Sequence, residues 1–140
     1  METNSFASLS LSSEILSVVQ ELGFVQMTPI QSQSIPLLLE GKDIVGRSKT
    51  GSGKTAAFML PILQNLVLKQ RTVQALILCP TRELSVQVSK EARKFGRRLS
   101  DLQVVAVYGG VPAREQIISM QSGPQIVVGT PGRVLDLIDR

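Results

Sequence analysis

Residues 47–58 read RSKTGSGKTAAF, a glycine-containing turn that joins an apolar run to a segment with helical spacing. Gly51 and Gly53 allow the backbone to curl closely around atoms that a Cβ would push away. The N–H groups at the start of the following helix have no backbone partners, and together with the helix dipole they favour an anion. The turn therefore predicts a phosphate-binding loop between a strand and a helix.

Two side chains at the end of this turn define its phosphate chemistry. Lys54 places a positive charge where the β- and γ-phosphates of a nucleoside triphosphate would lie, and the Thr55 hydroxyl can bind Mg²⁺. Lys54 and Thr55 are thus the candidate catalytic residues, with Thr55 as the candidate metal ligand. The common pattern G-x-x-x-x-G-K-[ST] has glycine at the position of Ser48, so a strict match fails at its first letter.

A dinucleotide site is the main alternative for the same turn. Residues 51–56 also satisfy G-x-G-x-x-[GA], a pattern that needs an acidic residue about twenty positions further on to hold a ribose hydroxyl. The next predicted strand ends in residues 79–82 (CPTR), and the first carboxylate after it is Glu83. A triphosphate site is therefore favoured over a dinucleotide site and over a glycine turn without a ligand.

Alternation along the chain indicates the fold class. Short apolar runs bounded by turn residues predict buried strands at residues 43–46, 75–79, 104–108 and 125–129. Helical spacing separates these runs, at residues 55–68, 82–99 and 112–121. Strands that alternate with helices indicate parallel crossovers, so we predict an α/β fold, a parallel sheet with helices on both faces.

Two capped helices, at residues 12–22 and 29–40, are predicted ahead of the first strand. They form an N-terminal addition to the sheet. The expected organisation is a helical segment over residues 1–41, followed by a nucleotide-binding α/β domain over residues 42–140.

Composition excludes several other classes of site. The 140-residue chain has a formal net charge of +4, no histidine and one cysteine, so a disulfide within the chain and a Cys/His metal site are excluded. Cys79 is expected to be a small buried residue. No apolar run reaches membrane length and the first residues lack signal-peptide features, so we expect a cytoplasmic protein. The basic cluster at residues 93–98 is more typical of a solvated helix end than of a nucleic-acid contact.

Several further motifs can be read together with the phosphate loop. Residues 23–31 (GFVQMTPIQ) resemble the Q motif of DEAD-box RNA helicases, with Phe6 as the isolated upstream aromatic. Residues 48–55 are similar to the phosphate loop of that family, which begins with a small residue, and this accounts for Ser48. Residues 80–84 (PTREL) resemble motif Ia of the family. Gly109 and Gly110 resemble its paired glycines, and residues 130–133 (TPGR) resemble its motif Ib.

The resemblance extends from Phe6 to the helix after Arg133, and it leans toward the bacterial branch that includes the DbpA-like members. It implies ATP and Mg²⁺ as cofactors. The Gln31 amide offers an acceptor and donors that match the N6 and N7 edge of adenine, as glutamine does when it reads this base in DNA. Phe24 or Phe6 stacks on the base in one interpretation, and in the other Phe24 is a core anchor. The expected nucleotide-binding residues are Phe24, Thr28, Gln31, Ser48, Lys49, Thr50, Gly51, Ser52, Gly53, Lys54 and Thr55.

The PTREL and TPGR motifs each follow a predicted strand, and ligands of open parallel sheets gather outside the carboxyl ends of the strands. The turns there contain hydroxyls, helix N-termini and arginines, which suit binding of successive phosphates of a nucleic-acid strand. Taken alone, each turn is more typical of an ordinary helix N-cap without a ligand. Such contacts sense backbone geometry, so with the resemblance they imply RNA bound with little sequence preference. The expected RNA-binding residues are Pro80, Thr81, Arg82, Gly109, Gly110, Thr130, Pro131, Gly132 and Arg133.

The resemblance implies part of the first RecA-like domain of an ATP-dependent RNA helicase, an enzyme that couples ATP hydrolysis to local separation of RNA duplexes. None of the predicted strands ends in the acidic pair that completes the Mg²⁺ site of such enzymes. We therefore expect that motif, and a second RecA-like domain as a partner, beyond residue 140, and no ATP hydrolysis by residues 1–140 alone. The alternatives are a stand-alone nucleotide-binding regulatory module and a DNA-directed motor ATPase.

Overall fold

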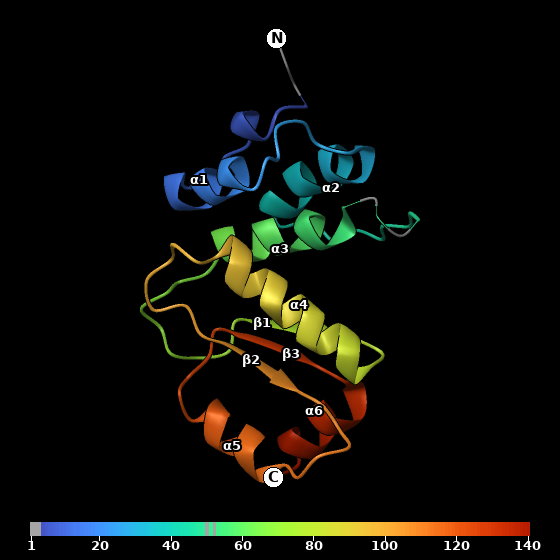
Figure 1. Cartoon of the computed structure of the whole chain (residues 1–140), viewed down its shortest axis with the longest axis vertical. Coiled ribbons are helices and arrows are strands. Elements are labelled where there is room, and N and C mark those ends of the chain that lie inside the picture. The colour runs from blue at the N-terminus through green and yellow to red at the C-terminus, as the bar shows by residue number, and fades with distance from the viewer. Residues whose placement is uncertain (1–3, 50, 52) are drawn as a thin grey trace. The chain divides into compact units, whose positions relative to one another are not determined.

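A computed structural model describes residues 4–49, 51 and 53–140 (Figure 1). The chain divides into two compact units. The first unit runs to Leu66 and includes Phe95–Leu99, and the second comprises Val67–Lys94 and Ser100–Arg140. The turn at residues 47–58 thus belongs to the same unit as the N-terminal helices. The domain boundary expected at residues 41 and 42 stays a prediction.

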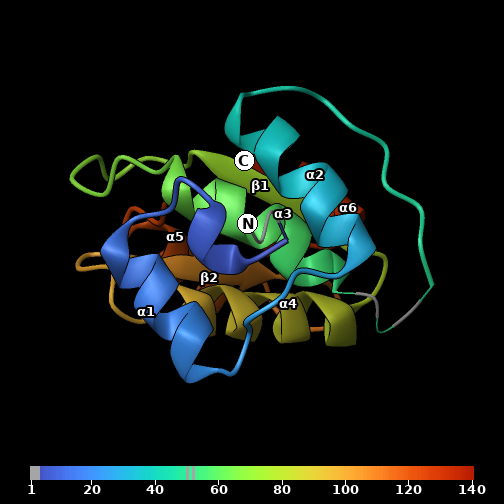
Figure 2. The same cartoon turned by 90° about the horizontal axis from the view of Figure 1, so that it is seen from above.

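The described residues of the first unit form helices and loops. The elements are the short 3-10 helix η1 (Phe6–Ser8), α1 (Ser13–Glu21), α2 (Pro29–Leu39) and α3 (Lys54–Gln64). α2 packs against α3, as both views show (Figures 1 and 2). Fully buried apolar side chains from each element form the core of this unit, and the largest are Phe6, Ile15, Ile35, Met59 and Leu60.

Local signals in the sequence set where these helices begin and end. The Ser12 hydroxyl accepts a hydrogen bond from Ile15 N at 3.3 Å and caps α1. Pro29 occupies the first turn of α2, where its missing N–H is not needed. The helix expected at residues 55–68 is confirmed but ends earlier, at Gln64, because the chain turns at Asn65.

The second unit contains a parallel sheet of three strands. Its elements are β1 (Ala75–Leu78), α4 (Arg82–Phe95, of which all but Phe95 lie in this unit), β2 (Val104–Val107), α5 (Arg114–Met120), β3 (Ile126–Gly129) and α6 (Pro131–Ile138). The strand order is β1-β3-β2, with Leu78 and Val107 both level with Gly129. The predicted α/β class, the parallel strands and the helices between them are confirmed.

Helices cover both faces of this sheet. α4 lies on one face, and α5 and α6 lie on the other (Figure 1). Val105, Val107 and Val127 point to the second face and pack with side chains of α5 and α6. β3 is buried along its whole length, as expected for a central strand, whereas β1 alternates between half-buried and exposed residues.

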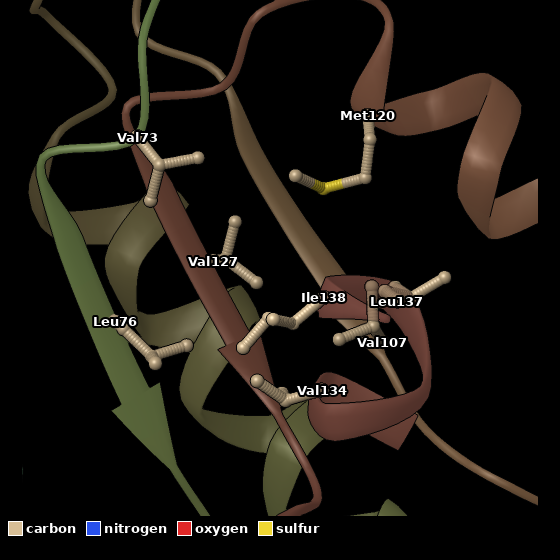
Figure 3. A pocket seen from close by; sticks show the side chains of 8 residues that line it. All are labelled: Val73, Leu76, Val107, Met120, Val127, Val134, Leu137 and Ile138. Carbon is tan, nitrogen blue, oxygen red and sulfur yellow. The ribbon is translucent and has the colours of Figure 1, made fainter. Parts of the chain in front are cut away.

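An apolar hollow of about 310 Å³ opens on the second face of the sheet. Figure 3 shows Leu76 and Val127 of the sheet on its floor, with Met120 of α5 and Ile138 of α6 beside them. Ile138 is 70% exposed and Leu76 is 49% exposed. The hollow is therefore a shallow apolar surface and not a closed cavity.

A buried glutamine fixes the amino ends of the strands. Gln125 is fully buried, and its amide nitrogen donates to Leu68 O at 2.9 Å and to Asp101 O at 3.0 Å. Its side-chain oxygen accepts from Gln103 N at 2.8 Å. The side chain thus replaces water for three backbone groups in the loops that precede the strands.

Residues 43–46, expected to be the first strand, form no strand in the structure. A strand needs a hydrogen-bonded neighbour, and among the described residues β1, β2 and β3 pair only with one another. Val45 is 93% exposed, so this apolar run also lacks a covering layer. The expectation of a strand here is wrong for this structure, and the phosphate-loop turn follows an irregular segment.

None of the helices formed by the described residues combines the length and the apolar character needed to cross a lipid bilayer.

Candidate functional site

The predicted phosphate loop closes directly onto the first turn of α3. Gly53 is the N-cap residue with φ of +88°, and Gly51 has φ of +82°, conformations that residues with a Cβ rarely adopt. The first turn of α3 contains no acidic residue, so no carboxylate of that turn neutralises its N–H groups. Thr50 and Ser52, two of the expected nucleotide-binding residues, lie outside the described residues.

Lys54 places a positive charge beside this helix start. Its Nζ donates a hydrogen bond to Ser48 O, which draws the side chain back over the loop. Lys49 and Lys54 are exposed, and Thr55 is half-buried one residue into the helix. A cation, a helix N-terminus and a hydroxyl therefore meet at one place, an arrangement that suits an anion.

Gln31 connects the Q-motif segment to the phosphate loop. Its side chain is buried, with 1% of its surface exposed. Oε1 accepts from Thr28 N at 2.9 Å, and Nε2 donates to Gly53 O at 3.2 Å. The absence of a Cβ on Gly53 makes this possible, because a Cβ there would lie against Gln31 Nε2 and 3.0 Å from Gln31 Cδ.

The two hydrogen bonds of Gln31 use only part of the hydrogen-bonding capacity of its amide. Oε1 keeps a second lone pair and Nε2 a second N–H, which is the pair of groups that an adenine N6 and N7 edge requires. Beside it, the buried Thr28 Oγ1 belongs to the capping box that Thr28 and Gln31 form at the start of α2. This atom would lie 3.3 Å from a Cβ on Gly53. The Thr28 hydroxyl thus lies next to the loop, beside the Gln31 amide.

These features fit a nucleoside triphosphate. The phosphates would be held by Lys54 and the N–H groups of the first turn of α3, and the base edge by Gln31. Among the described residues, no group of three or more histidine, cysteine, aspartate or glutamate side chains is close enough to hold a metal ion. If Mg²⁺ is bound here, the Thr55 hydroxyl and the phosphate oxygens could be among its ligands.

The candidate base-stacking residues lie in an aromatic cluster of the first unit. The Phe24 ring contacts Phe6 edge-on, with centroids 5.8 Å apart, and contacts Phe95 at 5.9 Å. Phe6 and Phe95 are almost fully buried, whereas Phe24 is half-buried. Aromatic pairs in such geometry stabilise a core. The contacts favour the core-anchor interpretation of Phe24 over stacking on a base.

The expected RNA-binding turns lie together at one edge of the sheet. In the parallel strands, Leu78, Val107 and Gly129 are level with one another. The residues that follow them therefore leave the sheet at the same carboxyl edge. These are the turn from Pro80 to Arg82, the loop from Tyr108 to Gly110, and the start of α6 from Thr130 to Arg133.

Two of these turns are joined by Tyr108. The Arg82 guanidinium lies 4.8 Å from the centre of the Tyr108 ring, within the range of a cation–π contact. Thr81 Oγ1 accepts from Leu84 N at 3.1 Å and so caps α4. Arg82 itself is exposed, so its charge is presented to solvent beside this edge.

Arg133 is placed differently from what its motif suggests. Its side chain is only 12% exposed. One terminal nitrogen donates to Gln116 Oε1 at 2.9 Å and the other to Val111 O at 2.8 Å, while Nε lies 3.6 Å from Asp136 Oδ2. All three side-chain nitrogens of Arg133 thus have a partner within the chain. Sequence reasoning missed Gln116, because a single glutamine in a short helix carries no pattern.

The basic cluster at residues 93–98 is largely paired within the chain. Arg97 and Arg98 both form ion pairs with Glu21. Arg98 also donates to Ser17 Oγ at 3.1 Å, and Arg93 donates to Val104 O at 2.8 Å. These contacts favour the interpretation as a helix end over a nucleic-acid contact.

Cys79 follows β1 and is buried. Burial raises the pKa of its thiol, and a hydrogen bond with Ser85 opposes this effect only in part. The thiol stays protonated near neutral pH, in agreement with the expectation of a small buried residue.

The parallel sheet with its flanking helices and the loop closing onto α3 define an α/β domain of the RecA-like, phosphate-loop type. The DEAD/DEAH box helicase family matches residues 28–140, and the chain belongs to this family.

Relatives and solved structures agree with this assignment. The chain is 51% identical over 135 residues to DEAD-box ATP-dependent RNA helicase CshA of Streptococcus pneumoniae, and 49% identical over 135 residues to ATP-dependent RNA helicase DeaD of Escherichia coli. The matches cover 96% of this chain but 26% and 22% of those proteins. The chain thus spans about a quarter of the length of these curated relatives.

Two crystal structures share the fold. A DEAD box protein from Methanococcus jannaschii superposes with a TM-score of 0.90 at 40% identity, covering 97% of this chain and 37% of that one. A hypothetical ATP-dependent RNA helicase from Sulfolobus tokodaii superposes with a TM-score of 0.80 at 44% identity, covering 92% of this chain and 37% of that one.

Proposed function

We propose that this chain binds ATP with Mg²⁺ and the backbone of RNA, as the ATP-binding portion of an ATP-dependent RNA helicase. The observation that carries the proposal is the Gln31 side chain, which is hydrogen-bonded to Gly53 O of the phosphate loop. It brings a group able to recognise adenine next to the groups able to hold phosphate. A site that binds nucleotides whatever their base needs only the groups that hold phosphate.

Each residue of the nucleotide site then has a separate task. Gln31 recognises the adenine edge, and Lys54 stabilises the negative charge of the β- and γ-phosphates. The Thr55 hydroxyl orients Mg²⁺, which when bound polarises the phosphoryl group. Gly51 and Gly53 leave two positions of the loop without a Cβ atom, so that the backbone there can approach the phosphates.

RNA binds in this proposal at the carboxyl edge of the sheet in the second unit. Successive phosphates would be bound by hydroxyl groups of Thr81 and Thr130. Backbone N–H groups of the paired glycines and of the first turns of α4 and α6 would add further hydrogen bonds. Arg82 adds an exposed positive charge. Because these groups contact the sugar-phosphate backbone, the binding has little sequence preference.

Hydrolysis and duplex separation need groups beyond this set. Phosphoryl transfer requires positioned Mg²⁺, an oriented water and arginine charge together, and Lys54 and Thr55 supply only part of them. We propose that a second RecA-like domain acts as the partner that supplies the rest, in the cytoplasm. Residues 1–140 alone are then inactive as an ATPase.

Titration of residues 1–140 with ATP and Mg²⁺, and separately with single-stranded oligouridylate, tests this proposal. We expect binding of both, with equal-length single-stranded DNA bound more weakly than RNA. A folded chain that binds no ATP would refute the nucleotide site. DNA bound as tightly as RNA would favour a DNA-directed motor, and ATP binding without any nucleic-acid binding would favour a regulatory module.

A further inference from the structure

The loop that holds the paired glycines is fixed by a buried glutamine. Gln116 of α5 is 7% exposed. Its Oε1 accepts from Tyr108 N at 3.2 Å, and its Nε2 donates to Tyr108 O at 3.1 Å. The amide thus satisfies both backbone groups of the residue that follows β2 and precedes Gly109.

Arg133 completes this arrangement from α6. The same Gln116 Oε1 accepts from Arg133, and Arg133 also donates to Val111 O at 2.8 Å. Tyr108 and Val111 are the residues on either side of the paired glycines. Both ends of the glycine loop are therefore held, one by Gln116 and the other by Arg133, and the loop is tied to the helix that begins with the TPGR turn.

The hydrogen bonds of Gln116 and Arg133, which we call the clamp, leave both glycines of the loop accessible. Both are exposed, and a Cβ added at either would meet no heavy atom of the described chain within 4 Å. Gly110 has φ of +84°, which explains glycine at that position, but Gly109 has no such conformation. Packing within the described chain therefore gives no reason for a missing side chain at Gly109, whereas close approach of a ligand does.

We propose that Gln116 is a positioning residue for RNA binding, which sets the glycine loop at a fixed distance from the TPGR turn. The inference rests on the proposed function. It also gives Arg133 a positioning role, since its donors hold Gln116 and Val111. Recognition of successive phosphates by backbone groups depends on their spacing, and a loop that is already ordered loses less entropy on binding.

The chain offers a matched control in Gln125. Both glutamines are buried in the second unit, and both make three hydrogen bonds through the amide. Gln125 lies at the amino end of the strands, away from the proposed RNA edge. Methionine approximates the size of glutamine and lacks its hydrogen bonds, so Gln116→Met and Gln125→Met remove comparable structural support from opposite ends of the sheet.

The experiment compares oligouridylate and ATP binding by these two variants and the wild-type chain, with hydrogen exchange of the Tyr108 amide, which donates to Gln116 Oε1. Gln116→Met should weaken RNA binding by about tenfold through loss of loop order, speed exchange of the Tyr108 amide, and leave ATP binding unchanged. Gln125→Met should lower stability but leave RNA binding within about twofold of wild type, as expected for a site remote from the ligand. Equal effects of both variants on RNA binding, or no effect of Gln116→Met, would overturn the role of Gln116.

Arg133→Lys keeps the proposal testable where Gln116→Met does not fold. Lysine retains the charge but lacks the planar fork that reaches Gln116 and Val111 together. Weaker RNA binding by Arg133→Lys supports the clamp, and wild-type affinity refutes it. If the wild-type chain binds ATP but no RNA, the RNA part of the proposed function is refuted, and the role of Gln116 with it. If the wild-type chain binds RNA and Gln116→Met binds it equally well, only the role of Gln116 is refuted.

Discussion

Substitution of Gly53 by alanine tests the connection between the Q-motif segment and the phosphate loop. Gly53 has φ of +88°, and a new Cβ would lie against Gln31 Nε2, 3.0 Å from Gln31 Cδ and 3.3 Å from Thr28 Oγ1. The far end of the Gln31 side chain must therefore move. Its hydrogen bonds to Gly53 O and Thr28 N are then lost inside a buried site.

The expected magnitude has two parts. An alanine in the left-handed conformation costs about 1–2 kcal/mol relative to glycine. Loss of the two hydrogen bonds of Gln31 costs about 1–3 kcal/mol more, because the Gln31 amide itself is buried. Gly53→Ala should thus lower the free energy of unfolding by roughly 2–5 kcal/mol, the sum of these terms.

Gly51→Ala is the matched control. Gly51 has φ of +82°, but a Cβ there would meet nothing within 4 Å among the described residues. This variant should lose only the conformational part, about 1–2 kcal/mol. Urea denaturation followed by far-ultraviolet circular dichroism measures both. Equal losses in the two variants would refute the reasoning that Gln31 stabilises the loop.

Further predictions concern ligand binding and turnover. Gln31→Ala should narrow the preference for ATP over GTP by about 1–3 kcal/mol, by analogy with base readout, and an unchanged ratio of the two dissociation constants would contradict the role of Gln31. Lys54→Ala should weaken ATP binding by about 1.5–3 kcal/mol, the usual value for a hydrogen bond to a charged group, while its melting temperature stays near that of wild type because Lys54 is exposed. Wild-type ATP affinity in that folded variant would rule the lysine out. Residues 1–140 should show no RNA-stimulated ATP hydrolysis in a phosphate-release assay, and turnover near that of a full-length helicase would overturn the division of tasks proposed above.

Much of the fold could be predicted because it depends on local patterns. The strands at residues 75–79, 104–108 and 125–129 combine apolar residues with flanking turn signals, and all three form within a residue of their expected bounds. Residues 43–46 carry a similar signal but form no strand. A local pattern specifies a tendency to be extended, whereas a strand exists only with a hydrogen-bonded neighbour.

The candidate sites were less accessible to sequence reasoning. Side-chain chemistry suggested Lys54 and Thr55, and the resemblance to the Q motif indicated Gln31. The structure brings Gln31 and the loop together. Arg133 and Phe24 were harder to assign, since an arginine can bind phosphate or a carbonyl, and a phenylalanine can stack on a base or fill a core. Only tertiary contacts distinguish these uses, and the same holds for Gln116.

The apolar hollow on the sheet has a practical consequence for measuring the stability of this chain. Leu76, Val127, Met120 and Ile138 line an accessible surface without charged groups. Environment-sensitive dyes become fluorescent on such surfaces, so they should bind the folded chain and give a high signal before any unfolding. Dye-based melting curves would then report release from the hollow along with exposure of the core. Intrinsic circular dichroism is the sounder signal for comparing variants of this protein.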